Sequence, residues 1–293
     1  MFVRVERQWG RLRRWFMRKF RPGHVNLWKG RRRGHCERFT EDVIDPRDLK
    51  FIRSVCGYDF DPALDVYRRR ETLGFARYGY AELVGFSVLF GLGSTLGSIL
   101  AVLVHPAFFL ISTICVVFWV EVIWFFRDPE RIVPSDPRSV VSPADGTITH
   151  VETVNEPGIG SKCLRISIFL SVFNVHGNRI PRDSRVEEVS YFRGRYLDAR
   201  HPNCAAQNEQ LWLDLVDAQS QVRFRVKQIS GAIARRIVCW LRLGEVVKAG
   251  DRYGMIKFGS RTDLIVPSEH ISETLVKVGD KVRGGVTVLA KWQ

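Results

Sequence analysis

The sequence has no cysteine motif. Its six cysteines are scattered along 293 residues, and no two of them form a CxxC pair. Zinc knuckles need closely spaced ligands, and disulfide frameworks need many cysteines in a short chain. The spacing therefore disfavours both classes and predicts no metal site. Cysteines placed in this way are typical of small buried side chains in a reducing compartment.

Acidic residues are scarce at the start of the chain. Residues 1–38 contain 13 Lys and Arg but 2 Asp and Glu, so they carry +11 of the formal net charge of +14. The basic character therefore belongs to an N-terminal arm and not to the rest of the chain. A charge of this sign indicates an anionic membrane, a nucleic acid or an acidic ligand as partner.

The arm has the periodicity of an amphipathic helix over residues 2–21. Apolar side chains recur at steps of three and four, at Val5, Trp9, Leu12, Phe16 and Phe20. Arginines fill the opposite side, at positions 4, 7, 11, 14 and 18. This pattern favours a helix lying on an anionic lipid surface over a nucleic-acid arm or a disordered basic tail.

A long apolar run from Leu83 to Phe126 follows the polar segment 24–80. The run is about twice the roughly 20 residues that one membrane helix needs, and His105-Pro106 interrupts it. We expect two spans, 84–104 and 107–126, in a re-entering hairpin. Basic residues on both flanks place both ends in the cytoplasm. A buried hairpin in a soluble core is the alternative.

From Val140 onward the pattern changes to short strands. β-Branched runs alternate with Gly, Pro and Asp turns, which predicts a mainly β domain. The segments 244–251 and 275–282 each read as a strand, a Gly-Asp turn and another strand, as in lipoyl- and biotinyl-like barrels. The expected organisation is an N-terminal extension (1–82), a hydrophobic hairpin that anchors the chain (83–126) and a β-rich domain (127–293).

Several motifs within residues 84–293 occur in an order and spacing that resembles one enzyme family. They are Phe125–Arg131, Ser142–Gly146, Phe169–Pro181, Gln207–Glu209, Gln228–Val238 and Gly254–Asp263. Together they are similar to the short, bacterial and archaeal branch of the phosphatidylserine decarboxylases. The resemblance implies a proenzyme that cuts itself between Gly259 and Ser260.

The resemblance also implies the chemistry. The Ser260 hydroxyl attacks the Gly259 carbonyl, and the resulting ester eliminates to leave a dehydroalanine. Water then hydrolyses the dehydroalanine to ammonia and a pyruvoyl group, which is the cofactor. This group forms a Schiff base with the amine of phosphatidylserine, so that CO2 is lost and phosphatidylethanolamine is released without a metal. Glycine at position 259 suits a strained, accessible carbonyl.

Two more catalytic residues follow from the family comparison. A serine nucleophile needs a base, and a histidine oriented by a carboxylate is the usual solution. The motifs match His176 and Asp145 to these roles. Arg179 stands where the longer branch of the family has a second histidine, which is linked to self-cleavage. Either His176 does both jobs or Arg179 binds the substrate phosphate.

Three other arginines are candidates for binding the lipid phosphate: Arg235, Arg236 and Arg261. A second cleavage-like motif, Leu92-Gly93-Ser94-Thr95, matches the longer branch but lies inside the apolar hairpin. Small residues in membrane helices usually serve packing, so we expect no cleavage there.

The sequence thus predicts a self-cleaving decarboxylase on the cytoplasmic face of a cell membrane. Its expected partners are phosphatidylserine, an anionic lipid surface, and the small and large chains of the cut proenzyme, with no nucleic acid. The family often self-associates, so a homo-oligomer is also expected. A lipoyl-like carrier module, an inactive relative and a decarboxylase acting on another amine-bearing substrate are the alternatives.

Overall fold

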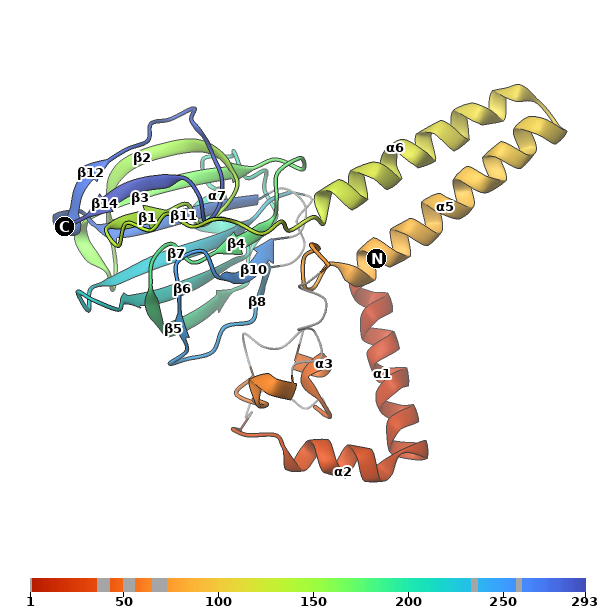
Figure 1. The fold of residues 1–293 in the computed structure, drawn as a ribbon, viewed down its shortest axis with the longest axis horizontal. Coiled ribbons are helices and arrows are strands. Elements are labelled where there is room, and N and C mark those ends of the chain that lie inside the picture. Colours follow the sequence, from red (N-terminus) through yellow and green to blue (C-terminus); the bar gives the residue numbers. More distant parts are fainter. Residues whose placement is uncertain (1, 36–42, 50–55, 65–72, 233–236, 257–259) are drawn as a thin grey trace. The chain divides into compact units, whose positions relative to one another are not determined.

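The computed structural model describes residues 2–35, 43–49, 56–64, 73–232, 237–256 and 260–293 (Figure 1). The chain divides into two compact units, Met1–Asp128 and Pro129–Gln293. The first unit is helical where it is described, and the second is built mainly from antiparallel strands. A β-rich domain preceded by a helical hairpin is therefore confirmed.

The first unit begins with three short or medium helices. They are α1 (Phe2–Phe20), α2 (Pro22–Gly30) and α3 (Pro46–Leu49), followed by the 3-10 turn η1 (Pro62–Leu64). The helix that the sequence predicts over 2–21 is confirmed as α1. Along α1 the side chains of Trp9, Leu12 and Phe16 are about half exposed or more, at 65%, 54% and 47%. One apolar face of the helix is thus uncovered in the unit.

An ionic clamp also fixes α1. Arg13 donates to Asp45 at 2.5 Å and to Asp48 at 2.6 Å, and Arg14 donates to Asp48 at 3.1 Å. Asp45 is fully buried. Burial raises its pKa, but hydrogen bonds from Arg47 and Arg13 outweigh this and hold the pKa of Asp45 below its usual value.

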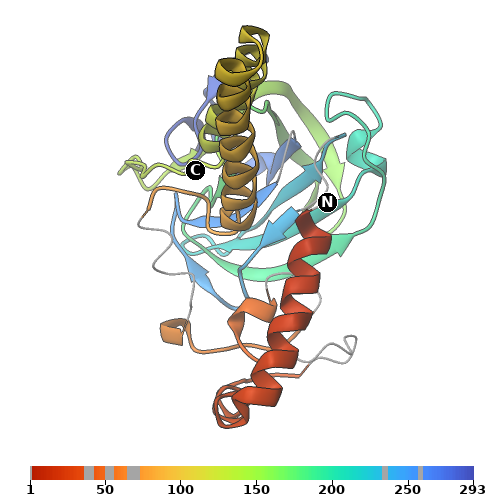
Figure 2. The ribbon, with the colours of Figure 1, turned by 90° about the vertical axis from the view of Figure 1, so that its right-hand side faces the viewer.

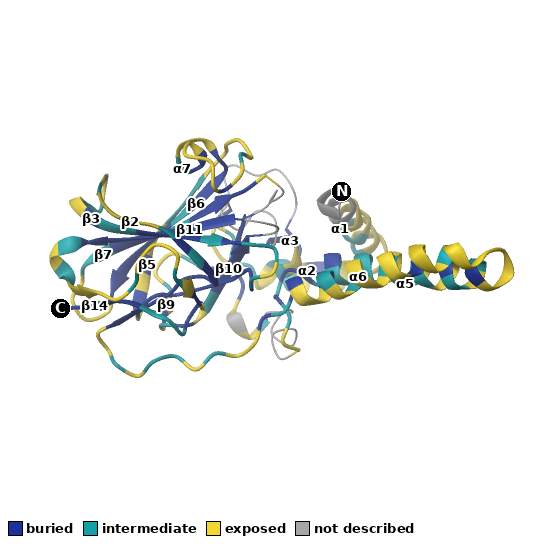
Figure 3. Cartoon of the chain, turned by 90° about the horizontal axis from the view of Figure 1, so that it is seen from above, coloured by how far each residue is buried: buried dark blue, intermediate teal, exposed yellow. Residues whose placement is uncertain are grey.

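Two long apolar helices form a hairpin. They are α5 (Tyr80–Leu103) and α6 (Phe109–Phe125), joined through the 3-10 turn η2 (Pro106–Phe108), so the predicted break at His105-Pro106 is confirmed. By length and composition both segments suffice to cross a membrane. Few residues of the hairpin are buried, and the others are exposed or intermediate, whereas most strand residues are buried (Figure 3). Exposed apolar helices of this length are typical of membrane association.

The contact between α5 and α6 explains the small residues in and near the second cleavage-like motif, Leu92–Thr95. A Cβ on Gly93 would lie 2.9 Å from Cys115 Sγ, and one on Gly97 would lie 2.9 Å from the Ser112 nitrogen. The Ser112 hydroxyl is 2.9 Å from that of Ser94. Residues 92–95 therefore serve close helix packing inside a regular helix, as expected.

The second unit contains one large sheet and two small ones. The large sheet has eight antiparallel strands in the order β13-β2-β3-β11-β7-β6-β5-β9, and it curls into a half-barrel (Figures 1 and 2). The small sheets have the orders β1-β14-β12 and β4-β10-β8. In chain order the elements are β1 (Ser139–Val141), β2 (Gly146–Glu156), β3 (Gly160–Leu170), β4 (Gly177–Arg179), β5 (Ser184–Phe192), α7 (Cys204–Gln207), β6 (Gln210–Asp217), β7 (Arg223–Ser230), β8 (Ile237–Cys239), β9 (Val246–Val247), β10 (Arg252–Ile256), β11 (Ser260–Pro267), η3 (Ser268–His270), β12 (Ile271–Thr274), β13 (Lys281–Val282) and β14 (Val288–Trp292).

The two similar Gly-Asp segments fold in the same way. In the first, Lys248 N donates to Asp251 Oδ2 at 2.8 Å, and Gly250 has φ +82°. In the second, Lys277 N donates to Asp280 Oδ2 at 2.9 Å, and Gly279 has φ +96°. A positive φ strains any residue with a Cβ, which is why both turns use glycine. The turns predicted from the repeat are confirmed.

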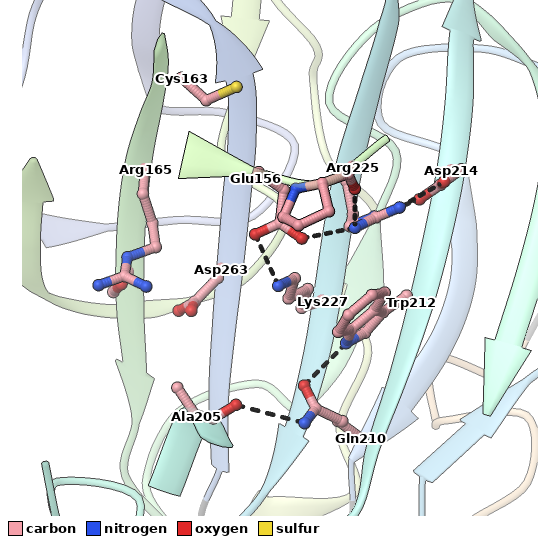
Figure 4. Close-up of polar contacts among 12 residues, drawn as sticks. Glu156, Cys163, Arg165, Ala205, Gln210, Trp212, Asp214, Arg225, Lys227 and Asp263 are labelled. Atoms are coloured by element: carbon pink, nitrogen blue, oxygen red, sulfur yellow. Dashed lines mark hydrogen bonds and ion pairs between the residues drawn. The ribbon is translucent and has the colours of Figure 1, made fainter. Parts of the chain in front are cut away.

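The large sheet has an apolar face and a charged face. Alternate residues of β3, β11, β7 and β6 form the core, including Ile168, Leu264 and Leu213, all 1% exposed or less. On the other face Arg225 donates to both carboxylate oxygens of Asp214, at 2.5 and 2.8 Å, and Lys227 donates to Glu156 at 2.8 Å (Figure 4). The central strands are therefore covered on both sides.

A buried ion pair at the edge of this unit makes stability depend on pH. Arg182 Nε donates to Asp217 at 2.7 Å, and both side chains are at most 5% exposed. Burial raises the pKa of Asp217, but hydrogen bonds from Arg182 and Ser220 outweigh it and lower the pKa. A lowered folded-state pKa stabilises the fold above the unfolded pKa of about 3.9, and this stabilisation is lost as the pH falls below it.

We therefore expect Asp217→Asn to lower the melting temperature at pH 7, because it removes the charge that Arg182 binds. The difference from the unmodified protein should shrink as the pH falls below about 3.9, because protonation of Asp217 removes the charge that distinguishes the two proteins. Thermal unfolding in detergent at several pH values measures this. Glu273→Gln, at an exposed position of β12, is the control and should change little. An equal loss at both pH values would contradict the linkage.

Candidate active site

Ser260 is the first residue of a central strand. β11 lies between β3 and β7, and the antiparallel register places Ser260 opposite Leu170 on one side and Ser230 on the other. Ser260 is 0% exposed, and its hydroxyl has no hydrogen-bond partner in the described part of the chain. Gly259 lies outside the described residues. A buried hydroxyl without a partner is uncommon and is often functional.

His176 lies at the entry of β4, next to the strand that leads towards Ser260. In the antiparallel pairing Gly177 is opposite Met255 and Asn178 is opposite Gly254 on β10. His176 is 1% exposed, and its Nδ1 is 2.9 Å from the carbonyl oxygen of Asn174. A carbonyl only accepts, so Nδ1 is the donor in this contact.

Asp145 lies in the turn between β1 and β2, and its carboxylate accepts hydrogen bonds from a side chain and a backbone amide. Arg131 Nη2 donates to its Oδ2 at 2.9 Å, and the amide of Gly284 donates to its Oδ1 at 2.7 Å. The side chain is nearly buried, with the residue 8% exposed. Both carboxylate oxygens thus have donors, and a role of Asp145 in orienting His176 stays a prediction. Sequence reasoning missed Arg131 as a partner, although the motif Phe125–Arg131 contains it.

A chain of buried polar side chains connects the strand after His176 with the strand of Ser260. Gln228 Nε2 donates to Asn178 Oδ1 at 2.7 Å, and Asn178 Nδ2 donates to Thr262 Oγ1 at 3.2 Å. All three residues are 0% exposed. We call this set the amide bridge. It holds β4, β7 and β11 together at the level of Ser260, and no short-range pattern in the sequence indicated it.

The amide bridge requires close contact between the backbones of β10 and β8. A Cβ on Gly254 would lie 2.4 Å from the carbonyl oxygen of Val238 and 3.0 Å from Gln228 Nε2. Any side chain there would therefore push β10 away from β8 and from the amide bridge.

Arg179 uses its guanidinium for backbone contacts. Nη1 donates to the Gly250 carbonyl at 3.1 Å and Nη2 donates to the Pro129 carbonyl at 2.8 Å. The residue is 4% exposed, and a Cβ on Gly285 would lie 2.8 Å from Arg179 Cδ. These contacts hold loops of the second unit together. Binding of a phosphate by Arg179 stays a prediction.

Of the other three candidate arginines, the structure describes Arg261, whose side chain is bound elsewhere. Arg261 donates to Asp263 at 2.6 and 3.0 Å and to Ser167 at 2.8 Å. As the next residue in a strand, it points to the charged face, opposite to the Ser260 side chain. Arg235 and Arg236 lie outside the described residues. Their role in binding substrate stays a prediction.

Ser260 and His176, the nucleophile and base that the sequence predicts, are both buried, at 0% and 1% exposed. Their chemical roles stay predictions. Among the residues that the structure describes, no group of three or more His, Cys, Asp and Glu side chains is placed to hold a metal ion.

Comparison with known proteins shows which family the sequence is similar to. The sequence model of the family described as phosphatidylserine decarboxylase matches residues 120–290. A phosphatidylserine decarboxylase proenzyme of Rhodopirellula baltica is 39% identical over 246 residues, covering 84% of this chain and 99% of that protein. One of Geotalea uraniireducens is 42% identical over 209 residues, covering 71% and 94%.

The amide bridge yields a stability prediction. Asn178→Ala should leave Gln228 Nε2 and Thr262 Oγ1 without their partner, and each unsatisfied buried group costs about 1–3 kcal/mol. We expect a clearly lower free energy of unfolding in denaturant titration. Asn155→Ala, at an exposed position of β2, is the matched control and should leave it nearly unchanged. Equal stability of the two variants would show that the bridge contributes little.

Proposed function

The chain belongs to the phosphatidylserine decarboxylase family, and from this premise we propose that Ser260 is where the proenzyme cuts itself and forms its pyruvoyl group. The activity is the conversion of phosphatidylserine to phosphatidylethanolamine and CO2. The observation that supports Ser260 is its fully buried, unpartnered hydroxyl at the start of a central strand. Serine hydroxyls elsewhere in a fold normally have partners.

The residues around Ser260 fit a pyruvoyl group. This group needs little more room than serine. The Ser260 hydroxyl has no hydrogen-bond partner among the described residues, so its conversion to a carbonyl would break no structural contact. When formed, it supplies a carbonyl that accepts the substrate amine and an electron sink for the charge left by departing CO2.

We propose that His176 is the base for self-cleavage. Ser260 Oγ attacks the preceding carbonyl carbon while its proton passes to His176 Nε2. The proton then passes to the nitrogen of residue 260 as the C–N bond breaks, which leaves an ester. The hydrogen bond from Nδ1 to Asn174 supports this role, because it makes Nε2 the basic nitrogen.

Arg179 and Asp145 take supporting roles in this proposal. Arg179 cannot act as a base, since a guanidinium keeps its proton in proteins. Its two contacts with backbone carbonyls favour a role in loop order. Asp145 bridges Arg131 and the Gly284 amide, so it holds the turn 142–146 against the C-terminal loop. We therefore assign both steps that need a histidine to His176.

The cut leaves two chains that stay together. A chain starting at residue 260 has 34 residues and carries β11, β12, β13 and β14. β11 pairs with β3 and β7, β14 pairs with β1, and β13 pairs with β2. All these partner strands belong to the larger chain. The Gly-Asp hairpins on either side of the cut are arranged, we propose, as in lipoyl- and biotinyl-like barrels.

Membrane association follows from the apolar hairpin, and we propose its orientation. Arg127 follows α6 and Arg77 precedes α5, so both ends of the hairpin lie at the cytoplasmic face by the positive-inside rule. α1 adds a second, interfacial contact with anionic lipid through its exposed apolar face. This arrangement brings a lipid substrate and a cytoplasmic catalytic unit to the same surface.

The site assignment predicts whether each variant cleaves itself, and how fast. Ser260→Ala should remain one uncut chain of about the full mass, because the nucleophile is missing. His176→Ala should cut slowly, by at least about 100-fold, because general base catalysis contributes roughly 10²–10⁴. Intact-mass measurement of the purified protein follows the 34-residue chain. Ser272→Ala, at an exposed position of β12, should process normally.

Two results would contradict these assignments. Release of CO2 from phosphatidylserine by Ser260→Ala would show that residue 260 does not supply the electron sink. Normal processing of His176→Ala would move the base to another residue.

The proposed lipid contact of α1 is also testable. A solvent-sensitive fluorescent amino acid at position 16, on the apolar face, should shift to the blue when the protein is placed in phosphatidylglycerol vesicles. The same residue at position 11, on the basic face, is the control and should stay in water. High salt should reduce the shift at position 16. An identical response at both positions would exclude this orientation.

A further inference from the structure

A second serine lies directly opposite Ser260. β11 and β7 are antiparallel, and their register pairs Ser260 with Ser230 and Thr262 with Gln228. Side chains of directly opposed residues point to the same face, with Cβ atoms about 4.5–5.5 Å apart. The Ser260 and Ser230 side chains are therefore neighbours on the face that carries the amide bridge.

Both hydroxyls are buried without a partner. Each serine is 0% exposed, and neither Oγ has a hydrogen-bond partner within the described residues. A buried hydroxyl of this kind has given up its bonds with water and gained none, so it lowers stability. Two of them on adjacent strands indicate that Ser230, like Ser260, serves the reaction and not the resting fold.

The backbone of Ser230 is fixed on both sides. Its N–H donates to the Glu209 carbonyl at 2.9 Å, and its carbonyl accepts from Asn208 Nδ2 at 2.7 Å. Asn208 is itself 1% exposed and accepts from the Leu197 amide at 2.8 Å. Only rotation about χ1 remains for the Ser230 hydroxyl, which therefore turns toward or away from Ser260 while its Cβ stays in place.

We propose that Ser230 is a positioning residue for self-cleavage, an inference that rests on the proposed function of Ser260. In the attacking arrangement the Ser260 proton points to His176 and one lone pair points to the carbonyl carbon. The Ser230 hydroxyl donates a hydrogen bond to the remaining lone pair of Ser260 Oγ. This bond selects the attacking rotamer of Ser260, and Ser230 itself forms no covalent bond.

The first measurement is the rate of self-cleavage. A short pulse of cell-free translation followed by a chase gives the precursor, and mass spectrometry follows the appearance of the 34-residue chain. Ser230→Ala should cut roughly 2- to 12-fold more slowly, the loss expected for one neutral hydrogen bond. Ser230→Thr keeps the hydroxyl and should cut faster than Ser230→Ala.

The second measurement separates positioning from folding. Thermal unfolding is compared in a Ser260→Ala background, where every variant remains uncut. Ser230→Ala should leave the melting temperature unchanged or raise it, because it removes an unsatisfied buried group. A structural serine behaves in the opposite way. Ser184 is also 0% exposed, but its hydroxyl donates to the Arg182 carbonyl.

Ser184→Ala is therefore the matched control, with a lower melting temperature and an unchanged cleavage rate. Cleavage of Ser230→Ala at the full rate would overturn the role of Ser230 and leave that of Ser260 intact. A fall in melting temperature like that of Ser184→Ala would overturn it as well, by making Ser230 structural. An unmodified protein that never cuts would overturn the proposed function itself.

Discussion

The pairing of β11 with both of its neighbours is the constraint on which the rest of the site depends. The strand is bonded to β3 along all eight of its residues and to β7 along six. Because side chains alternate in a strand, a slip of one residue would turn Ser260 to the charged face and Arg261 into the core. The core on one side and the ion pairs of Arg225 and Lys227 on the other exclude that slip.

Features with a local pattern could be predicted from the sequence. The apolar run 83–126 predicted a helical hairpin because a helix satisfies its own backbone hydrogen bonds. The break at His105-Pro106 could be identified from the sequence alone. The periodicity of residues 2–21 predicted α1 in the same way. Both Gly-Asp turns depend on contacts three residues apart, such as Lys277 with Asp280. Ser260 and His176 were proposed from motifs, because the expected chemistry requires particular residue types, and their roles stay predictions.

Contacts between distant segments could not be predicted. Asn178 binds Thr262, 84 residues away, and Gln228, 50 residues away. Asp145 binds the Gly284 amide across 139 residues. A buried asparagine or glutamine has no periodicity that names its partner, and the partner is decided by sheet register. For the same reason sequence reasoning offered Arg261 as a substrate ligand, although its neighbour Asp263 binds it on the opposite face.

The interleaving of the four C-terminal strands with the rest of the sheets has a consequence for the lifetime of the enzyme. Before the cut, the two parts find each other within one molecule; after it, separated parts must meet by diffusion. The intact chain can therefore fold within one molecule, whereas the two cut chains, once separated, cannot. The lifetime of the cut enzyme is therefore set by the rate at which it unfolds or its chains dissociate, and not by a reversible folding equilibrium.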